Sequence, residues 1–217
     1  MALSRTAPTV ILGCLGREEK LLSEPFAQSL AQILKKVPEA IFLWTGKIEN
    51  PNVTTLFKSH GIEDQCRYIG WVNTRIYAQV LDVFIDGFPF ASGLTAFETM
   101  AAGSPVVALV TPEALEIGFP NHLWPGFSGA DGIEPEIHDY VREIFLNSKG
   151  DSVVSIVDTE CEYVDIAVRL ANDRDFREEA GQASKTFVER YMHDETAMAE
   201  TFSDYILDIY SQKASTA

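Results

Sequence analysis

Short apolar runs alternate with amphipathic segments along the first half of the chain, and this alternation limits the possible folds more than any other feature. The runs are almost continuous in Val, Ile, Leu and Phe, which is typical of strands buried on both faces of a sheet. They are Val10–Leu15, Ile41–Trp44, Tyr68–Gly70, Val83–Asp86 and Val106–Val110. Segments with helical spacing lie between them, at 25–37, 52–60, 76–81 and 95–102. Repeated strand–helix–strand units predict an α/β fold with a parallel sheet and flanking helices.

The second half of the chain has a different pattern. Residues 111–150 are rich in Pro, Gly, Ser and Asp, which indicates loops and turns, with one helix expected at 134–146. A last strand is expected at 152–157, followed by helices at 160–171, 175–190 and 195–210. We therefore expect a single domain over 1–217, with a core at 8–110, a divergent segment at 111–150, and the last strand and C-terminal helices at 151–213.

Composition excludes several classes of partner. The chain of 217 residues has a net charge of −15, so its surface repels nucleic acids and anionic lipids. If the substrate is an anion, the few cations must gather where it binds. No apolar run is long enough to span a membrane. The three scattered cysteines indicate reduced thiols in the cytoplasm, and the four scattered histidines give no reason to expect a metal.

Two short motifs have a functional and a structural interpretation, and we favour the structural one for each. Ile11-Leu12-Gly13-Cys14 looks like a lipoprotein cleavage box, but the apolar stretch around it is short, which favours a buried first strand. Asp173-Arg174-Asp175 is the only Asp-x-Asp motif of the kind that metal-dependent transferases use. It stands at an expected helix start, where acidic residues stabilise the helix dipole.

Ligands on parallel sheets bind at the carboxyl ends of the strands. The loops to search are therefore 16–23, 46–50, 70–75 and 87–93. The most informative segment is DGFPFASGLTAFETMAAGSPVV at 86–107, where Gly93-Leu94-Thr95 opens a helix. A helix start with free N–H groups suits a phosphate, and Glu98, one turn further on, is placed to accept hydrogen bonds from a ribose. Thr95 and Glu98 also match a capping box that needs no ligand, and the two interpretations are compatible.

Two other loops offer complementary chemistry. Arg17 and Lys20 follow the first strand and supply cations for a diphosphate, unless they are solvated and offset by the two acidic residues between them. Trp71 and Val72 follow the third strand and offer an apolar platform for a flat base. Trp71 is equally well explained as a core or interface aromatic residue.

The motifs together resemble a known family. GREEK at 16–20, TG at 45–46, GWV at 70–72, the segment 86–107 and ECEYVDIAVRLANDRDFREEAG at 160–181 occur in one order. This order resembles the C-terminal, donor-binding lobe of GT-B glycosyltransferases, most of all the O-linked N-acetylglucosamine transferases and their bacterial relatives. The resemblance implies a Rossmann-like lobe and a UDP-sugar donor. It also implies chemistry without a metal or other cofactor, in which cations and a helix dipole stabilise the leaving UDP.

The resemblance also implies individual roles. Lys20 and Arg17 would contact the diphosphate, Trp71 and Val72 would border the uracil, and Glu98 would hold the ribose. The residues expected to cradle the phosphates are Ser92, Gly93, Leu94 and Thr95. The chain departs from the family in three places: Phe90 replaces the first carboxylate of the E-x7-E pair of retaining enzymes, the Arg-containing helix is not recognisable in 114–131, and the loop before Tyr77 is shorter than in the animal enzymes. The first departure favours the inverting relatives.

The expected function is that of a glycosyltransferase donor lobe, with proteins among its candidate acceptors. In such enzymes a separate N-terminal lobe holds the acceptor and the catalytic base, so we assign no catalytic residue and expect that lobe or a partner protein to complete the site. The alternative is a non-enzymatic domain that binds nucleotide sugars or another protein. A nicotinamide-dependent oxidoreductase is disfavoured, because Gly13-Cys14-Leu15-Gly16 is not the G-x-G-x-x-G fingerprint.

Overall fold

A computed structural model describes residues 9–89, 92–109, 155–157, 159–192, 203 and 207. The strands are β1 (Ile11–Cys14), β2 (Ile41–Trp44), β3 (Cys66–Tyr68), β4 (Val83–Ile85), β5 (Val106–Leu109) and β6 (Ser155–Val157). The helices are α1 (Glu24–Lys36), α2 (Pro51–Ser59), α3 (Thr74–Tyr77), α4 (Leu94–Ala101), α7 (Glu160–Asn172) and α8 (Arg174–Met192). Two 3-10 turns, η1 (Glu18–Leu21) and η2 (Ala78–Val80), complete the described elements.

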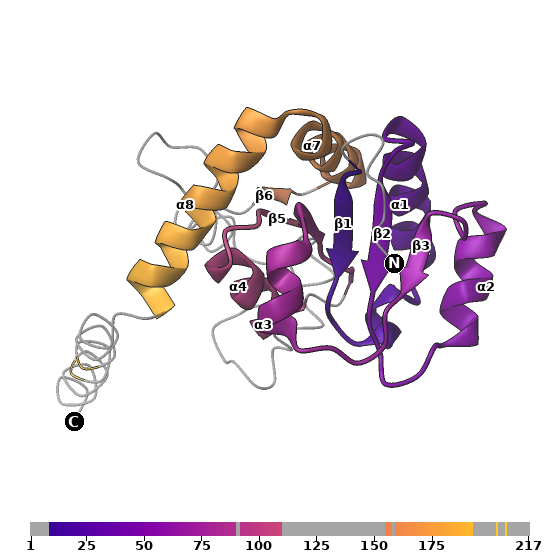
Figure 1. Cartoon of the computed structure of the whole chain (residues 1–217), viewed down its shortest axis with the longest axis horizontal. Helices are drawn as coiled ribbons and strands as arrows, with labels where there is room; N and C mark the ends of the chain where they lie inside the picture. The colour runs from indigo at the N-terminus through magenta and orange to yellow at the C-terminus, as the bar shows by residue number, and fades with distance from the viewer. Residues whose placement is uncertain are drawn as a thin grey trace, which may run out of the picture.

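All six strands pair in parallel, in the order β3-β2-β1-β4-β5-β6 (Figure 1). The chain winds outward from β1 through β2 to β3, then returns to place β4 on the other side of β1. The direction of winding therefore reverses between β1 and β4. Loops leave this point in opposite directions, which opens a crevice at the carboxyl edge of the sheet.

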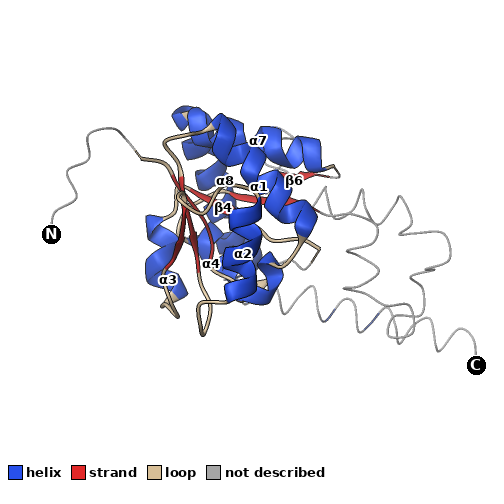
Figure 2. Cartoon of the chain, turned by 90° about the vertical axis from the view of Figure 1, so that its right-hand side faces the viewer, coloured by secondary structure: helices blue, strands red, loops and turns tan. Residues whose placement is uncertain are grey.

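Helices cover both faces of the sheet, with α1 and α2 on one side and α3 on the other (Figure 2). The apolar faces of α1 and α7 pack against each other, and α4 packs against α8. Aromatic contacts join α1 and α7 to the loop after β4. The ring centroid of Phe88 lies 5.7 Å from that of Phe26 in α1 and 5.2 Å from that of Tyr163 in α7. Because Phe88 is buried between two helices, the start of that loop is fixed by the core.

The parallel sheet, its flanking helices and the C-terminal helices α7 and α8 agree with the prediction. Residues Ile11–Cys14 form β1, in agreement with the strand that was favoured over a lipoprotein signal. The third strand lies two residues earlier than predicted, because Gly70 takes a φ of +79° and turns the chain away. The helix predicted at 76–81 begins earlier, at Thr74, because the side chain of Asn73 accepts the Arg75 N–H at 3.1 Å. The helix at 134–146 and most of 195–210 lie outside the described residues.

The start of α8 explains the Asp-x-Asp motif. The Asp173 carboxylate accepts the N–H of Phe176 at 3.0 Å and so caps the helix. This is the structural role predicted for the motif, and it accounts for an acidic residue at that position without a metal.

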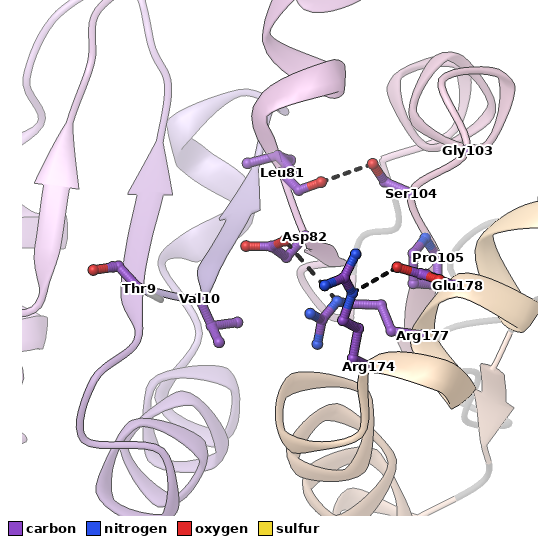
Figure 3. A pocket seen from close by; sticks show the side chains of 10 residues that line it. All are labelled: Thr9, Val10, Leu81, Asp82, Gly103, Ser104, Pro105, Arg174, Arg177 and Glu178. Carbon is purple, nitrogen blue, oxygen red and sulfur yellow. Dashed lines mark hydrogen bonds and ion pairs between the residues drawn. The ribbon is translucent and has the colours of Figure 1, made fainter. Parts of the chain in front are cut away.

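A cavity of about 390 Å³ lies at the amino edge of the sheet, where α8 meets the loops that enter β1, β4 and β5 (Figure 3). Its charged groups contact one another. Arg177 Nε lies 3.9 Å from Asp82 Oδ1, and Asp82 Oδ2 accepts the N–H of Ile11 at 2.7 Å. Arg174 Nε pairs with Glu178 Oε1 at 2.7 Å. The Arg177–Asp82 contact fastens α8 to the sheet, and the Arg174–Glu178 pair lies within α8, so we assign this cluster a structural role.

Candidate functional site

A second cavity, of about 440 Å³, opens at the carboxyl edge of the sheet, at the crevice between β1 and β4. It collects residues that follow four different strands. Its lining is Leu15, Gly16, Arg17, Lys20, Thr45, Trp71, Val72, Thr74, Ser92, Leu94, Thr95 and Glu98. Every residue predicted for the site except Gly93 is among them, and Gly93 lies between two that are. The structure thus brings the predicted set together, while contact with a ligand stays a prediction.

The start of α4 differs from the predicted capping box. Gly93, with a φ of +56°, is the N-cap, and no side chain caps the helix. Thr95 is the second helical residue, and its hydroxyl donates to the carbonyl oxygen of Ser92 at 3.2 Å. The capping-box interpretation is therefore wrong, because the helix and its N-cap lie two residues earlier than it requires. The first amide groups of α4 carry the positive end of the helix dipole, and Leu94 and Thr95 border the cavity there.

Glu98 is held by side chains from another helix. Its carboxylate accepts a hydrogen bond from the hydroxyl of Thr74 and lies 3.7 Å from Nε of Arg75. Both donors stand at the start of α3, which packs against α4. The Glu98 side chain keeps 22% of its surface exposed, so it is oriented and still open to the cavity. Thr74 was not predicted as a site residue, although its position after the third strand was within a searched loop.

Lys20, in the segment that follows β1, packs against the loop that follows β4. A Cβ atom on Gly16 would stand 3.3 Å from Cδ of Lys20, and one on Gly87 would stand 2.8 Å from its carbonyl oxygen. Both contacts are closer than a side chain at either glycine would normally allow. The two glycines therefore leave room for Lys20 beside both loops, and Lys20 lines the cavity rather than the far side of the sheet. Arg17 lines the same cavity and is exposed.

Asp86 directly follows β4 and is 3% exposed. Its two carboxylate oxygens accept the N–H of Ser92 at 2.9 and 3.0 Å. Burial raises the pKa of Asp86 to about 6, against the opposing effects of the Ser92 hydrogen bonds and of Lys20. The hydroxyl of Tyr163 donates to the Asp86 carbonyl oxygen at 2.6 Å, so α7 also holds the backbone of Asp86 in place. Asp86 was not predicted as a site residue, although a carboxylate that ends an otherwise apolar strand was a visible signal.

Trp71 and Leu94 give the cavity an apolar mouth. Their side chains are 68% and 69% exposed, respectively, and both line the cavity. Trp71 is therefore not a core residue, which removes one of the two interpretations that compete with a role in binding. Large exposed apolar groups beside a cavity are typical of surfaces that meet a ligand or a partner.

Among the described residues, no three His, Cys, Asp or Glu side chains come together as metal ligands would. Burial, followed by the charge of Asp86, raises the pKa of the Cys14 thiol to about 11, so this thiol beside the cavity stays protonated. In the part of the chain that the structure describes, none of the helices is both long and apolar enough to cross a bilayer.

Comparison with known proteins gives no match to a family model and none to a curated protein sequence. Solved structures do match. An O-GlcNAc transferase from Thermobaculum terrenum aligns with 97% of this chain at a TM-score of 0.70 and 16% identity. S. aureus TarM, in complex with Fondaparinux, alpha-GlcNAc-glycerol and UDP, aligns with 89% at 0.62 and 13%. The C-terminal domain of LpcC, a glycosyl transferase group 1 family protein from Francisella tularensis, aligns with 82% at 0.54 and 19%.

The chain has the fold of one lobe of a GT-B glycosyltransferase. It spans 38% of the O-GlcNAc transferase chain and 34% of TarM, but corresponds to 84% of the isolated LpcC domain. The unit that matches is thus a single lobe of these larger proteins. This confirms the fold that the sequence motifs predicted. In open parallel sheets, ligands bind where the winding reverses, which here is the cavity between β1 and β4.

Proposed function

We propose that this chain is the donor-binding lobe of a glycosyltransferase and that it binds a UDP-sugar in the cavity at the carboxyl edge of the sheet. One observation carries the proposal: Lys20, the uncapped start of α4 and Glu98 converge on one cavity at the point where the sheet reverses its winding. A cation and a helix start suit a diphosphate, and a carboxylate one turn along suits ribose hydroxyls.

Each part of the nucleotide has a proposed position. The diphosphate lies against the start of α4, formed by Gly93, Leu94 and Thr95, with Lys20 and Arg17 balancing its charge. Glu98, already oriented by Thr74, accepts hydrogen bonds from the ribose. The uracil lies against Trp71 and Val72. The volume of the cavity, about 440 Å³, is within the range of small-molecule sites. TarM, which has the same fold, was crystallised with UDP, which supports a uridine nucleotide.

In the proposed reaction an acceptor hydroxyl attacks the anomeric carbon of the sugar. The bond from that carbon to the β-phosphate oxygen breaks, and UDP leaves with the electron pair. The protein stabilises the charge on the leaving UDP with the dipole of α4 and the ammonium group of Lys20. The proton of the acceptor passes to a base that we place on a second lobe or a partner protein. No described residue of this chain is assigned as that base.

The alternative is a lobe that binds a nucleotide sugar without transferring it. It rests on Phe90, which stands at the position where retaining enzymes carry a first carboxylate. Release of free sugar or of a glycosylated product by the purified chain would exclude this alternative. We also propose that the protein works in the cytoplasm, where its thiols stay reduced.

Isothermal titration calorimetry with UDP and with UDP-N-acetylglucosamine tests the binding site. A charge-assisted hydrogen bond contributes roughly 1.5–3 kcal/mol, so Lys20→Ala should weaken binding by about 10- to 150-fold. Glu98→Gln should weaken it less, because the amide keeps one oxygen. Lys36→Ala is the matched control, since Lys36 pairs with Asp165 on the outside of α1. A folded chain that binds neither nucleotide, or a Lys20→Ala variant with unchanged affinity, would refute the proposal.

A further inference from the structure

Asp86 is a buried carboxylate in contact with the wall of the cavity. It is 3% exposed, and both of its oxygens face the N–H of Ser92, which lines the cavity. The backbone and Cβ of Lys20 pack against Gly87, the residue that follows Asp86, and the charge of Lys20 acts on the Asp86 carboxylate. Asp86 therefore bonds to the turn before α4 and lies within the electrostatic reach of a cation from the loop after β1.

Among the described residues, three titratable groups face Asp86, and one of them is charged. Cys14 of β1 lies 3.7 Å from the Ser92 hydroxyl through its Sγ, and its thiol keeps its proton because burial raises its pKa to about 11. Tyr163 of α7 also keeps its proton: burial raises its pKa well above 10, and its hydroxyl is a donor to the Asp86 carbonyl oxygen. Lys20 of η1 is the cation, and its charge lowers the pKa of Asp86 while burial raises it.

On the basis of the proposed function, we propose that Asp86 is a positioning residue that couples donor binding to proton uptake. In the empty cavity the Asp86 carboxylate holds the Ser92 turn and balances the charge of Lys20. When a diphosphate binds, Lys20 interacts with the phosphate oxygens, and Asp86 takes one proton from the solvent. An O–H bond forms on the carboxylate, the buffer loses the proton, and no other bond changes.

Two effects of binding act on Asp86 with the same sign. The diphosphate brings negative charge close to a buried carboxylate, which favours the neutral acid. It also engages the lysine that stabilised the carboxylate. The acidity of Asp86 therefore falls on binding, and by linkage the affinity for the donor rises as the pH falls through the range in which Asp86 titrates. Well above or below that range the protonation of Asp86 is the same in both states, and the affinity is constant.

Calorimetry in buffers of different ionisation enthalpy measures the protons taken up directly. The probe is UDP-N-acetylglucosamine, because its diphosphate is esterified at both ends, whereas the terminal phosphate of UDP loses its second proton near neutral pH. If the acidity of Asp86 falls about tenfold on binding, uptake at pH 6.5 is about half a proton per donor. The affinity would then be about eightfold higher at pH 5 than at pH 8.

Two variants separate this role from a purely structural one. Asp86→Asn keeps a side-chain oxygen for the Ser92 N–H but cannot titrate, so uptake should vanish and the affinity should lose its pH dependence. Asp82→Asn is the matched control at the other end of β4, since Asp82 also accepts a backbone N–H, that of Ile11. It should keep the wild-type uptake. If Asp86→Asn does not fold, the wild-type measurement still tests the role of Asp86, because binding without proton uptake would contradict it.

The outcomes distinguish the two proposals. Binding without proton uptake in the wild type, or uptake that persists in Asp86→Asn, overturns the role of Asp86 and leaves the donor site intact. Absence of any binding by the folded wild-type chain overturns the proposed function, and this inference with it. Uptake in the wild type and in Asp82→Asn that is lost in Asp86→Asn supports both.

Discussion

Replacing Asp86 by asparagine should change how the stability of the fold depends on pH, even without a ligand. Burial raises the pKa of Asp86 to about 6 in the folded chain, whereas an unfolded chain has an Asp pKa of about 3.9. The folded state therefore binds this proton more tightly. Protonation of Asp86 therefore stabilises the folded chain. This stabilisation is fully present below the pKa of the unfolded chain and is lost as the pH rises through about 6, which is opposite to the behaviour of a salt-bridged Asp.

The size of the effect follows from the two pKa values. The full difference corresponds to about 3 kcal/mol, at 1.36 kcal/mol for each factor of ten in acidity. About 1.4 kcal/mol of it should develop between pH 8 and pH 5. The asparagine side chain of the variant does not titrate. The free energy of unfolding of the wild type, minus that of Asp86→Asn, should therefore increase by about this amount as the pH falls from 8 to 5.

Urea unfolding followed by circular dichroism at pH 5, 6, 7 and 8 gives both free energies. Other titrating groups change the two proteins alike and cancel in the difference, and pH 5 stays above the sequence pI of about 4.6, near which solubility falls. A difference that is flat across this range would show that Asp86 titrates alike in the folded and unfolded chains. A difference that decreases toward pH 5 would show that its partners outweigh its burial, and the reasoning would be wrong.

Three further substitutions test the packing and the site. Gly181→Ala should lower the free energy of unfolding by about 2 kcal/mol or more, because its Cβ would stand 2.1 Å from the Gly103 carbonyl oxygen; an unchanged urea midpoint would contradict this. Thr74→Val should reduce UDP-sugar affinity about three- to tenfold, because Glu98 loses a donor that orients it; equal calorimetric affinities would contradict it. Trp71→Ala should also weaken binding, by about 1–3 kcal/mol if a base stacks there. The melting temperature of the Trp71→Ala variant should equal that of the wild type, since the Trp71 side chain is 68% exposed.

The fold could be predicted because a parallel sheet buried on both faces requires apolar runs, and these are plain in the sequence. Four of the runs match strands β1, β2, β4 and β5 closely. The errors lie at the ends of strands and helices, because single residues determine where an element begins or stops. Gly70 ended the third strand early by turning the backbone, and Asn73 started α3 early by accepting an amide hydrogen bond. Hydrophobic periodicity contains no information on either contact.

The site could be located because topology alone brings the carboxyl ends of neighbouring strands together. Residues that follow three different strands could thus be assigned to one cavity before their contacts were known. What the sequence could not show are contacts between distant side chains, such as Thr74 with Glu98, or a carboxylate that turns back to bind an amide, as Asp86 does with Ser92. The capping box failed for a related reason: the helix starts two residues earlier than the box requires, which places Thr95 inside it rather than at its N-cap.

The net charge of −15 gives the proposed site an unusual dependence on salt. At low ionic strength the whole protein repels a diphosphate, while the attraction by Lys20 acts over a few ångströms. Salt at about 0.15 M shortens the Debye length to about 8 Å, which screens the distant carboxylates much more than a contact in a cavity. Raising NaCl from about 20 to about 150 mM should therefore strengthen, or leave unchanged, the calorimetric affinity for UDP-N-acetylglucosamine. A loss of affinity with the steep slope of a phosphate-binding surface would mean that exposed cations, rather than Lys20 within the cavity, hold the ligand.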